Sequence, residues 1–210
     1  MWEKPIKAVR DAVIVMRKLF TGETVNFENE FFKVVNLKLE PTPINISIYI
    51  AARGPQMLRL VGRYGDGALL SAQTNYVEPS IKTVVKAAEA AGRSAKDIDF
   101  ADWLPVGIDD DREKARESVK KEAALVVSFF PDYMIESAEV SLEKAEKIRK
   151  YVRSRQMDKV VELIDDKIID QFSISGTPED VIDKLEMLEK KGLTHIMVGD
   201  PFGPDPKKSL

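Results

Sequence analysis

The residues Ile46-Ser47-Ile48-Tyr49-Ile50-Ala51, followed by Ala52-Arg53-Gly54-Pro55, decide the fold of this chain. The first six are mostly β-branched or aromatic, which is typical of a buried strand. The Gly-Pro pair then predicts a turn into a helix, because proline suits the first helical position. A strand that leads directly into a helix is the repeating unit of α/β folds.

The same alternation continues through the rest of the chain. The later predicted strands are 67–70, 100–108 and 194–199, and the predicted helices are 55–64, 81–91, most of 112–170 and 178–191. Pro131 is expected to break the long helical region, since proline removes a helical hydrogen bond. Strands joined by helical crossovers run parallel, so the sequence predicts an α/β protein with a parallel sheet.

The N-terminal residues follow a different pattern. Apolar residues recur at helical spacing over 5–20 before Gly22, which predicts an amphipathic helix. The β-prone stretches 24–27 and 31–35 flank a short polar turn and predict a hairpin-like excursion. No shift in composition marks a boundary, so we expect one domain over 1–210.

Composition excludes several classes of function. The chain has 210 residues with 32 Lys and Arg against 35 Asp and Glu, a formal net charge of −3, so no basic surface for nucleic acid or an anionic membrane is predicted. There is no cysteine, which removes disulfides, thiol nucleophiles and Cys-ligated metals. No apolar run reaches the roughly 20 residues that a membrane span needs. We expect a soluble, cytoplasmic protein without a signal peptide.

Ligands of parallel α/β folds bind at the carboxyl ends of the strands. This rule selects four stretches, 51–55, 71–75, 107–111 and 199–203, each of which is rich in glycine, proline or polar residues. Loops of this composition allow a backbone to approach a ligand closely.

Arg53 is the most informative charge in these stretches. It follows a predicted strand and precedes a helix start, where it could bind an anion together with free backbone N–H groups. A structural role, in which Arg53 caps the rim or pairs with Asp66 or Asp102, is equally consistent with the pattern.

The stretch Gly176-Thr177-Pro178-Glu179-Asp180 has two interpretations. A threonine N-cap, a proline at the first helical position and an acidic residue at the third form a near capping box. Alternatively, the helix N-terminus could bind a phosphate. The two carboxylates would compete with an anion there, which favours the plain helix start.

No nucleophile or metal site emerges from the remaining polar residues. His195 is the only histidine and lies inside a predicted strand, where a structural role is favoured over a catalytic one. The run Asp109-Asp110-Asp111 is better explained as a helix cap than as a metal site. Such a sheet suits an anionic cofactor that supplies its own chemistry.

Three stretches carry a resemblance to a known family. They are Glu3 to Phe32, Ile48 to Met57 with Gly65-Asp66-Gly67, and Gly176 to Val181 with Gly192 to Ile196. Together they resemble the luciferase-like (bacterial luciferase) superfamily. Within it, residues 51–55 and the ending 199–206 are most similar to archaeal coenzyme F420-dependent 5,10-methylenetetrahydromethanopterin reductases, enzymes of one-carbon metabolism.

The resemblance implies a TIM-type (β/α)8 barrel, of which this chain is the N-terminally truncated C-terminal half, with strands five to eight and the hairpin insertion. It implies an oxidoreductase that transfers hydride between reduced F420 and a pterin-like substrate. The implied cofactor contacts are Ala51, Ala52, Arg53 and Gly54 at the phosphate tail, Ser71, Gln73 and Thr74, Gly176 and Thr177, and Gly199 and Asp200. The resemblance places no catalytic residue and no metal ligand in this chain.

Two other functions stay open at this stage. The chain could be an FMN-dependent luciferase-like monooxygenase, because the superfamily shares rim positions and differs in cofactor and substrate. It could also be a non-catalytic half-barrel remnant or assembly subunit. A half-barrel exposes strand edges and a sheet face, so we expect it to pair with itself or with an N-terminal half.

Overall fold

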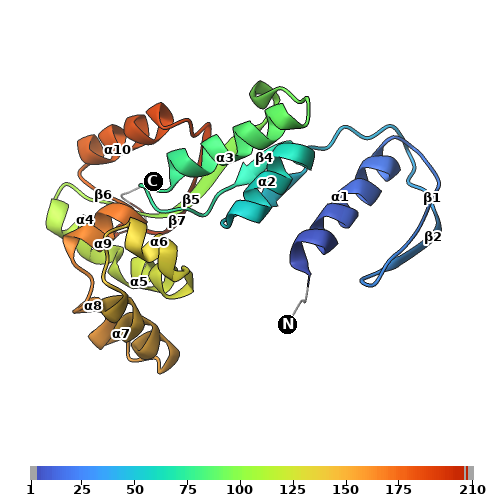
Figure 1. Cartoon of the computed structure of the whole chain (residues 1–210). Helices are drawn as coiled ribbons and strands as arrows, with labels where there is room; N and C mark the ends of the chain where they lie inside the picture. The colour runs from blue at the N-terminus through green and yellow to red at the C-terminus, as the bar shows by residue number, and fades with distance from the viewer. Residues whose placement is uncertain (1–3, 206, 208–210) are drawn as a thin grey trace. The chain divides into compact units, whose positions relative to one another are not determined.

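The computed structural model describes residues 4–205 and 207 and shows an α/β fold with parallel strand pairing (Figure 1). The chain divides into two compact units. The first contains the residues up to Leu69 together with Lys82–Asp99, and the second contains Leu70–Ile81 and the residues from Phe100 onward.

The first unit begins with a helix packed on a hairpin. Helix α1 (Pro5–Phe20) is followed by the antiparallel strands β1 (Val25–Glu28) and β2 (Lys33–Leu37), as predicted. The apolar side of α1 packs on the hairpin, where the rings of Phe27 and Phe32 stack with their centroids 5.4 Å apart.

The first unit also contains a parallel strand pair. Strand β3 (Tyr49–Ala51) pairs in parallel with β4 (Gly67–Leu69), and helix α2 (Pro55–Tyr64) connects them. The predicted strand from Ile46 is therefore three residues too long. The reason is Asp66, whose carboxylate accepts a hydrogen bond from the Ile48 backbone N–H at 2.8 Å and forms an ion pair with Arg17.

Close backbone packing fixes α2 against the second half of α3 (Val77–Ala90), which belongs to the same unit. A Cβ atom on Gly62 would lie 2.3 Å from the carbonyl oxygen of Val84. Arg93 then covers the C-terminal end of α2, donating to the carbonyl oxygens of Gly62 and Gly65 at 2.9 and 2.7 Å. A short 3-10 helix, Ala95–Asp97, follows α3.

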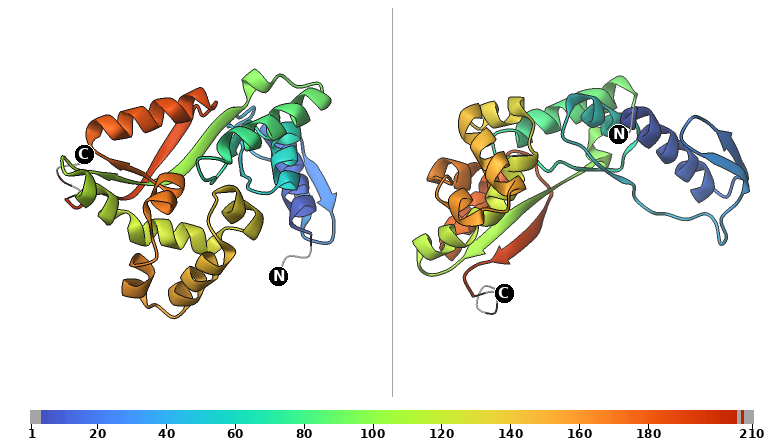
Figure 2. Two further views of the ribbon diagram at one scale, coloured as in Figure 1. Left: turned by 60° about the vertical axis from the view of Figure 1, so that its left-hand side comes forward. Right: turned by 90° about the horizontal axis from the view of Figure 1, so that it is seen from below.

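The second unit is built around strand β5 (Asp99–Ile108), which enters it at Phe100. Both β6 (Ile174–Gly176) and β7 (His195–Phe202) pair with it in parallel, and β5 and β7 lie side by side in Figure 2. The sequence predicts the last strand to end at Gly199, but the ladder resumes after a register shift and continues to Phe202. Strand β6 was not predicted.

Seven helices follow β5 within the described part of this unit. They are α4 (Arg112–Ser118), α5 (Lys120–Phe129), α6 (Asp132–Ser137), α7 (Leu142–Arg153), α8 (Met157–Val161), α9 (Asp166–Phe172) and α10 (Pro178–Lys190). The predicted break at Pro131 is confirmed, since α5 ends before it and α6 begins after it. In the core the rings of Phe130 and Phe172 meet edge to face at 5.3 Å.

Residues 4–205 and 207 do not form a closed barrel, so the fold shown is an open α/β arrangement with parallel strands.

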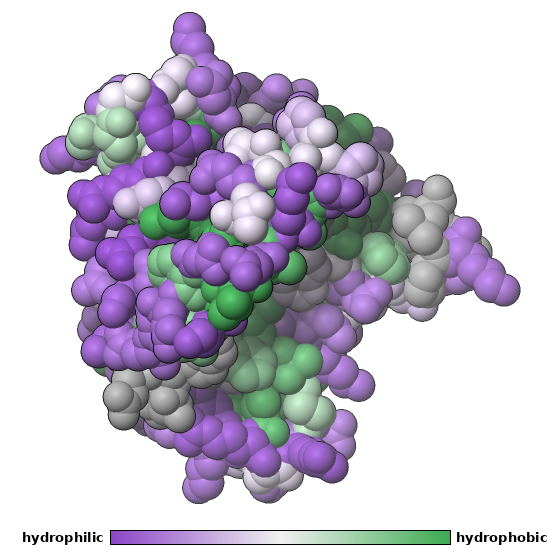
Figure 3. Space-filling model, turned by 90° about the vertical axis from the view of Figure 1, so that its right-hand side faces the viewer, coloured by the Kyte–Doolittle hydropathy of each residue, from purple (hydrophilic) through white to green (hydrophobic). Residues whose placement is uncertain are grey.

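Hydrophobic side chains reach the surface beside hydrophilic ones on the face drawn in Figure 3. Within the second unit Trp103, Met197 and Val198 are exposed on β5 and β7. Among the described helices, none is long and apolar enough to cross a membrane.

The contact at Gly62 yields a test of the α2–α3 packing. Replacing glycine by alanine inside a helix normally stabilises it by about 1 kcal/mol. We expect Gly62→Ala to lower the free energy of unfolding by about 1–3 kcal/mol instead, because the new methyl group meets the Val84 carbonyl oxygen. Urea denaturation measures this change. The exposed neighbour Arg63→Ala is the control and should shift stability by less than about 0.5 kcal/mol; stabilisation by Gly62→Ala would contradict the packing.

Candidate functional site

In the first unit, the candidate segment is the turn between β3 and α2. Ala51 ends the strand, and the backbone N–H of Ala52 donates to the Leu69 carbonyl oxygen at 2.8 Å, which continues the parallel ladder by one residue. Ala52 is buried, whereas Arg53 and Gly54 are half-buried. The strand therefore delivers Arg53 directly to the start of α2.

The start of α2 differs from the start of α10, although both have a proline in the first turn. Gly54 is the N-cap of α2; no side chain caps this helix, and its first turn has no acidic residue. At α10, Thr177 Oγ1 accepts from the Asp180 N–H while the Asp180 carboxylate accepts from the Thr177 N–H at 2.9 Å. Backbone donors at a helix start attract anions. At the start of α2 no side chain caps the backbone N–H groups, so they suit an anionic ligand. At the start of α10 the capping box already uses them.

The capping box also accounts for the glycine that precedes it. Gly176 has a φ of +148°, and a Cβ atom there would lie 2.5 Å from the Asp180 carboxylate. The Thr177 N–H and the Arg112 guanidinium hold the pKa of Asp180 below its usual range. The predicted capping interpretation is confirmed, and it gives Gly176 and Thr177 a role in starting a helix.

In the second unit, the candidate rim is the segment Leu70–Asn75 beside β5. Leu70 N–H donates to the Ala101 carbonyl oxygen at 2.9 Å. The next contact is a side-chain one: Ala72 N–H donates to Asp102 Oδ1 at 3.0 Å, and Trp103 N–H donates to the same oxygen at 2.8 Å. Asp102 is fully buried. Its carboxylate therefore holds the rim segment against the strand.

The rim segment is also anchored to three helices of the second unit. Gln73 Nε2 donates to the Met134 carbonyl oxygen at 3.0 Å and to Ser137 Oγ at 2.6 Å on α6. Thr74 N–H donates to the Gln171 carbonyl oxygen at 3.0 Å on α9. Lys191, just after α10, donates to the Thr74 carbonyl oxygen at 3.0 Å. These bonds give the segment one fixed conformation.

Gln73 differs from its predicted position. The sequence places it on the rim, but the structure buries it completely, with its amide directed to α6. Its Oε1 atom is buried without a hydrogen-bond partner among the described residues. Thr74 is also buried, whereas Ser71 is half-buried and takes a left-handed backbone conformation with φ of +46°. Of the three predicted rim residues, Ser71 is the one whose side chain is partly accessible.

Gly199 and Asp200 lie within β7, not in a loop after it, because the ladder continues to Phe202. Gly199 is opposite Pro105, and a Cβ atom there would lie 2.5 Å from the Trp103 indole ring. Packing against Trp103 therefore requires a glycine. Asp200 is exposed.

The predicted residues of the second unit do not all meet. Segment 70–75 is bound beside Ala101 and Asp102, whereas Gly176 pairs with Ile108 at the other end of β5. Six residues of strand separate these levels, which corresponds to about 20 Å along β5. Gly176 and Thr177 thus lie well away from Ser71.

Sequence reasoning missed the main role of Asp102, naming it only as a possible partner of Arg53. The available signal was an aspartate in the middle of an otherwise apolar predicted strand, since an ionisable residue is rarely fully buried without partners. Asp111 was predicted correctly as a cap and accepts from the Glu113 and Lys114 N–H groups. The described residues contain no group of three His, Cys, Asp or Glu that could hold a metal ion.

Comparison with known proteins places this geometry in a family. A family profile described as luciferase-like monooxygenase matches residues 1–195. The chain is 36% identical over 214 residues to the 5,10-methylenetetrahydromethanopterin reductase of Archaeoglobus fulgidus and 33% identical over 210 residues to that of Methanopyrus kandleri. These matches cover 100% and 98% of this chain. The chain spans 64% and 60% of the length of these relatives.

Solved structures agree with the sequence matches. The coenzyme F420-dependent tetrahydromethanopterin reductase from M. kandleri superimposes with a TM-score of 0.88 at 32% identity, over 98% of this chain and 60% of that one. An F420-dependent secondary alcohol dehydrogenase in complex with an F420-acetone adduct has a TM-score of 0.75 at 21% identity, over 97% of this chain and 58% of that one. The second likeness concerns the fold alone.

The role of Asp102 can be tested by a pair of substitutions. Asp102→Ala leaves the buried N–H groups of Ala72 and Trp103 without their acceptor, so we expect the free energy of unfolding to fall by about 2–4 kcal/mol. Asp102→Asn keeps an oxygen in place and should cost markedly less. Urea denaturation of both variants measures the difference. Equal losses in the two variants would show that the acceptor is not what Asp102 contributes.

Proposed function

This chain belongs to the luciferase-like monooxygenase family, and within that family we propose that it is an F420-dependent oxidoreductase or the C-terminal portion of one. The proposed reaction is hydride transfer between reduced F420 and methylenetetrahydromethanopterin or a related substrate. The observation that carries the proposal is the 36% identity over the whole chain to a methylenetetrahydromethanopterin reductase. The TM-score of 0.88 to a solved reductase described as F420-dependent supports the same assignment.

The donor set at the start of α2 fits the anionic tail of such a cofactor. Gly54 leaves the first turn without a side-chain cap, the first turn contains no acidic residue, and Arg53 directly precedes Gly54. Backbone N–H groups and a bidentate guanidinium together suit a phosphate group. We propose that Ala51, Ala52, Arg53 and Gly54 bind the phosphate of the cofactor.

In the second unit, we propose the rim segment as a region that contacts the ligand. Ser71 offers a partly accessible hydroxyl group, and the anchors at Gln73 and Thr74 hold its backbone in place. Asp200, exposed on β7, is a further proposed contact. For Gly176 and Thr177 the cofactor contact stays a prediction, because the capping box uses their polar atoms.

A deazaflavin, when bound, supplies the hydride chemistry itself. This chain's proposed contribution is to bind the phosphate, to fix the orientation of the ring and substrate, and to exclude water. We assign no catalytic acid or base to the residues described here. The proposal therefore concerns binding and positioning.

We also propose that the chain works in an assembly. Among the described strands, β7 pairs only with β5, and Met197 and Val198 on β7 are exposed together with Trp103. Parallel sheets are normally covered on both faces. A second copy or a separate N-terminal half-barrel would cover these side chains. Sedimentation that shows only monomers at micromolar concentration, in the absence and presence of such a half, would contradict this.

Cofactor binding is testable with Arg53. We expect F420 to bind with a dissociation constant that Arg53→Gln raises about tenfold or more, because a charged phosphate contact is lost. Arg59→Gln, an exposed arginine on the same helix, is the matched control and should leave the constant unchanged. Quenching of F420 fluorescence measures both.

The same titration separates the alternative functions. Tighter binding of FMN than of F420 would favour a flavin-dependent monooxygenase. Binding of neither, together with stable self-association, would favour a non-catalytic subunit. Binding of F420 that is insensitive to Arg53→Gln would retain the cofactor and reject the proposed phosphate site.

A further inference from the structure

The second unit contains a polar pocket that the proposed function does not use. It has a volume of about 370 Å³ and lies between α4, α9 and α10, with β6 at its base. Arg112, Arg116 and Lys184 line it, together with the hydroxyl groups of Ser173 and Ser175. Ser175 in its lining is opposite Gly107 of β5, five residues beyond Asp102.

Two of the three cations already have carboxylate partners. Arg112 Nε donates to the Asp180 carboxylate at 2.8 Å, and Arg116 forms ion pairs with Asp166 and Asp170, both at 2.8 Å. These pairs tie α4 to α9 and α10, which is a sufficient structural role for the arginines. They do not account for Lys184.

Lys184 is the unusual member of the pocket. Its ammonium group donates to the Asp170 backbone carbonyl oxygen at 2.6 Å and has no ion pair with any carboxylate of the described residues. Burial lowers the pKa of Lys184 to about 8; the nearby cations Lys191 and Arg116 act in the same direction, and Asp170 opposes them. A desolvated ammonium group without a counter-ion costs free energy.

The pocket also has hydroxyl groups suited to an oxyanion. Ser173 Oγ donates to the Ile169 carbonyl oxygen at 2.7 Å and lies 3.4 Å from Ser175 Oγ. A hydroxyl group can accept or donate as its ligand requires. Asp170 and Asp180 line the pocket as well, and Asp166 pairs with Arg116, so three cations are matched by three carboxylates. Lys184 is the cation of the three that has no ion pair among the described residues.

We propose that this pocket is a binding site for a phosphate group, in which the Lys184 ammonium group is the counter-charge and Arg112, Arg116 and Ser175 supply further donors. Free phosphate and the phosphoryl group of a small metabolite share this chemistry, and the volume of about 370 Å³ accommodates either. The pocket adjoins the rim segment, because the Asp170 carbonyl oxygen that accepts from Lys184 also accepts from Thr74 Oγ1 at 3.2 Å. None of the residues that line the pocket is itself a proposed cofactor contact.

Thermal unfolding in inorganic phosphate tests the proposal. We expect 10 mM sodium phosphate, compared with sodium chloride at equal ionic strength, to raise the midpoint by about 3–5 °C if that concentration is near ten times the dissociation constant. Lys184→Met should abolish the shift. This variant is expected to fold, since a half-buried ammonium group is replaced by an apolar chain of similar length.

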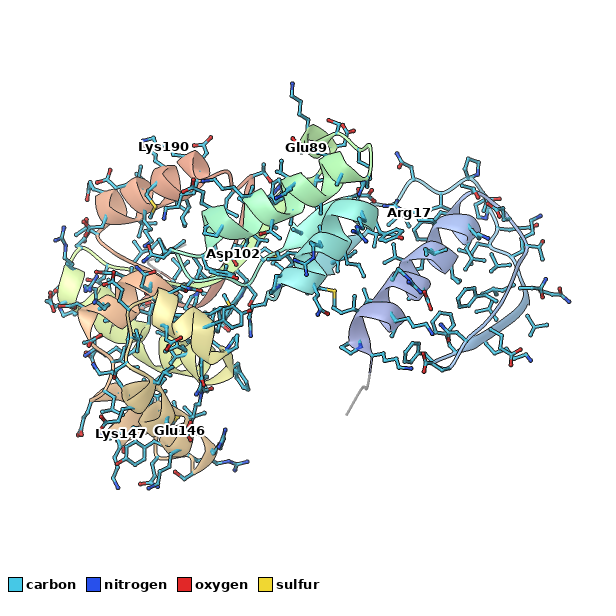
Figure 4. The ribbon with its side chains drawn as sticks, in the orientation of Figure 1. Arg17, Glu89, Asp102, Glu146, Lys147 and Lys190 are labelled. Carbon is cyan, nitrogen blue, oxygen red and sulfur yellow. The ribbon has the colours of Figure 1, made fainter. Side chains whose placement is uncertain are left out.

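Lys190→Met is the matched control. Lys190 lies on the same helix, points away from the ribbon in Figure 4, and has a side chain that is 76% exposed. It should keep the full phosphate response. An equal phosphate response in Lys184→Met and in the unmodified protein would overturn the proposal, because phosphate would then be acting as a general stabilising salt. A larger response to glycerol phosphate than to inorganic phosphate would identify a phosphorylated metabolite as the source.

A direct readout is the titration of Lys184, followed by NMR at its ε-carbon. Its folded pKa lies below its ordinary value of 10.5, so the unfolded chain binds more protons between about pH 8 and pH 10.5. The free energy of unfolding should therefore rise with pH across that window relative to Lys184→Met. Bound phosphate should raise the folded pKa of Lys184. A pKa of Lys184 that is the same with and without saturating phosphate would overturn the proposal.

Discussion

The buried carboxylate of Asp102 fixes the arrangement of the second unit around β5. One oxygen accepts the N–H groups of both Ala72 and Trp103, so it joins the rim segment to the strand where the strand's own ladder cannot. A carboxylate without such donors would be costly at this depth. With the rim segment held at Asp102, Gln73 donates to α6 and Thr74 donates to α9. The position of the rim segment therefore depends on one side chain of β5.

The length of β5 allows the rim segment and strand β6 to contact it at different positions. With ten residues it extends far beyond the point where Asp102 binds the rim segment. The two strands paired with it end at nearly the same level: Gly176 of β6 is opposite Ile108, and Phe202 of β7 is opposite Gly107. The rule that ligands gather at the carboxyl ends of parallel strands selects the segments that are proposed as ligand contacts. The rim segment is bound at Asp102, and the polar pocket lies beside β6, which pairs with the last three residues of β5.

Local patterns in the sequence predicted the features that depend on neighbouring residues, such as helices and their caps. Helix periodicity identified α1, α2 and α10, and the capping box at Thr177 was read correctly from its spacing. Contacts between residues far apart in the sequence caused the differences between the predicted and observed strand bounds. Ile48 leaves strand geometry because its N–H donates to Asp66, eighteen residues away. The ladder of β7 continues past Gly199 because β5 has residues left to pair with it. These strand ends could not be predicted from neighbouring residues, because the residues that set them lie far away in the sequence.

The difference between local and long-range contacts also explains why the position of Arg53 was predicted and the burial of Gln73 was not. Arg53 lies where predicted, since a strand followed by Gly-Pro determines its surroundings within a few residues. The burial of Gln73 depends on α6, sixty residues later, which the sequence did not reveal as a separate helix.

Two helices with similar starts show how the local sequence assigns different electrostatic roles. The start of α10 has Thr177 and Asp180 to saturate its N–H groups, and Arg112 neutralises the carboxylate, so an anion gains little by approaching. The start of α2 has neither a cap nor an acid, and an arginine precedes it. Six residues into α10, Lys184 instead donates to the Asp170 backbone carbonyl oxygen and forms no ion pair among the described residues. The places that suit an anion are therefore set by local caps and ion pairs, and not by the net charge of the chain, which is negative.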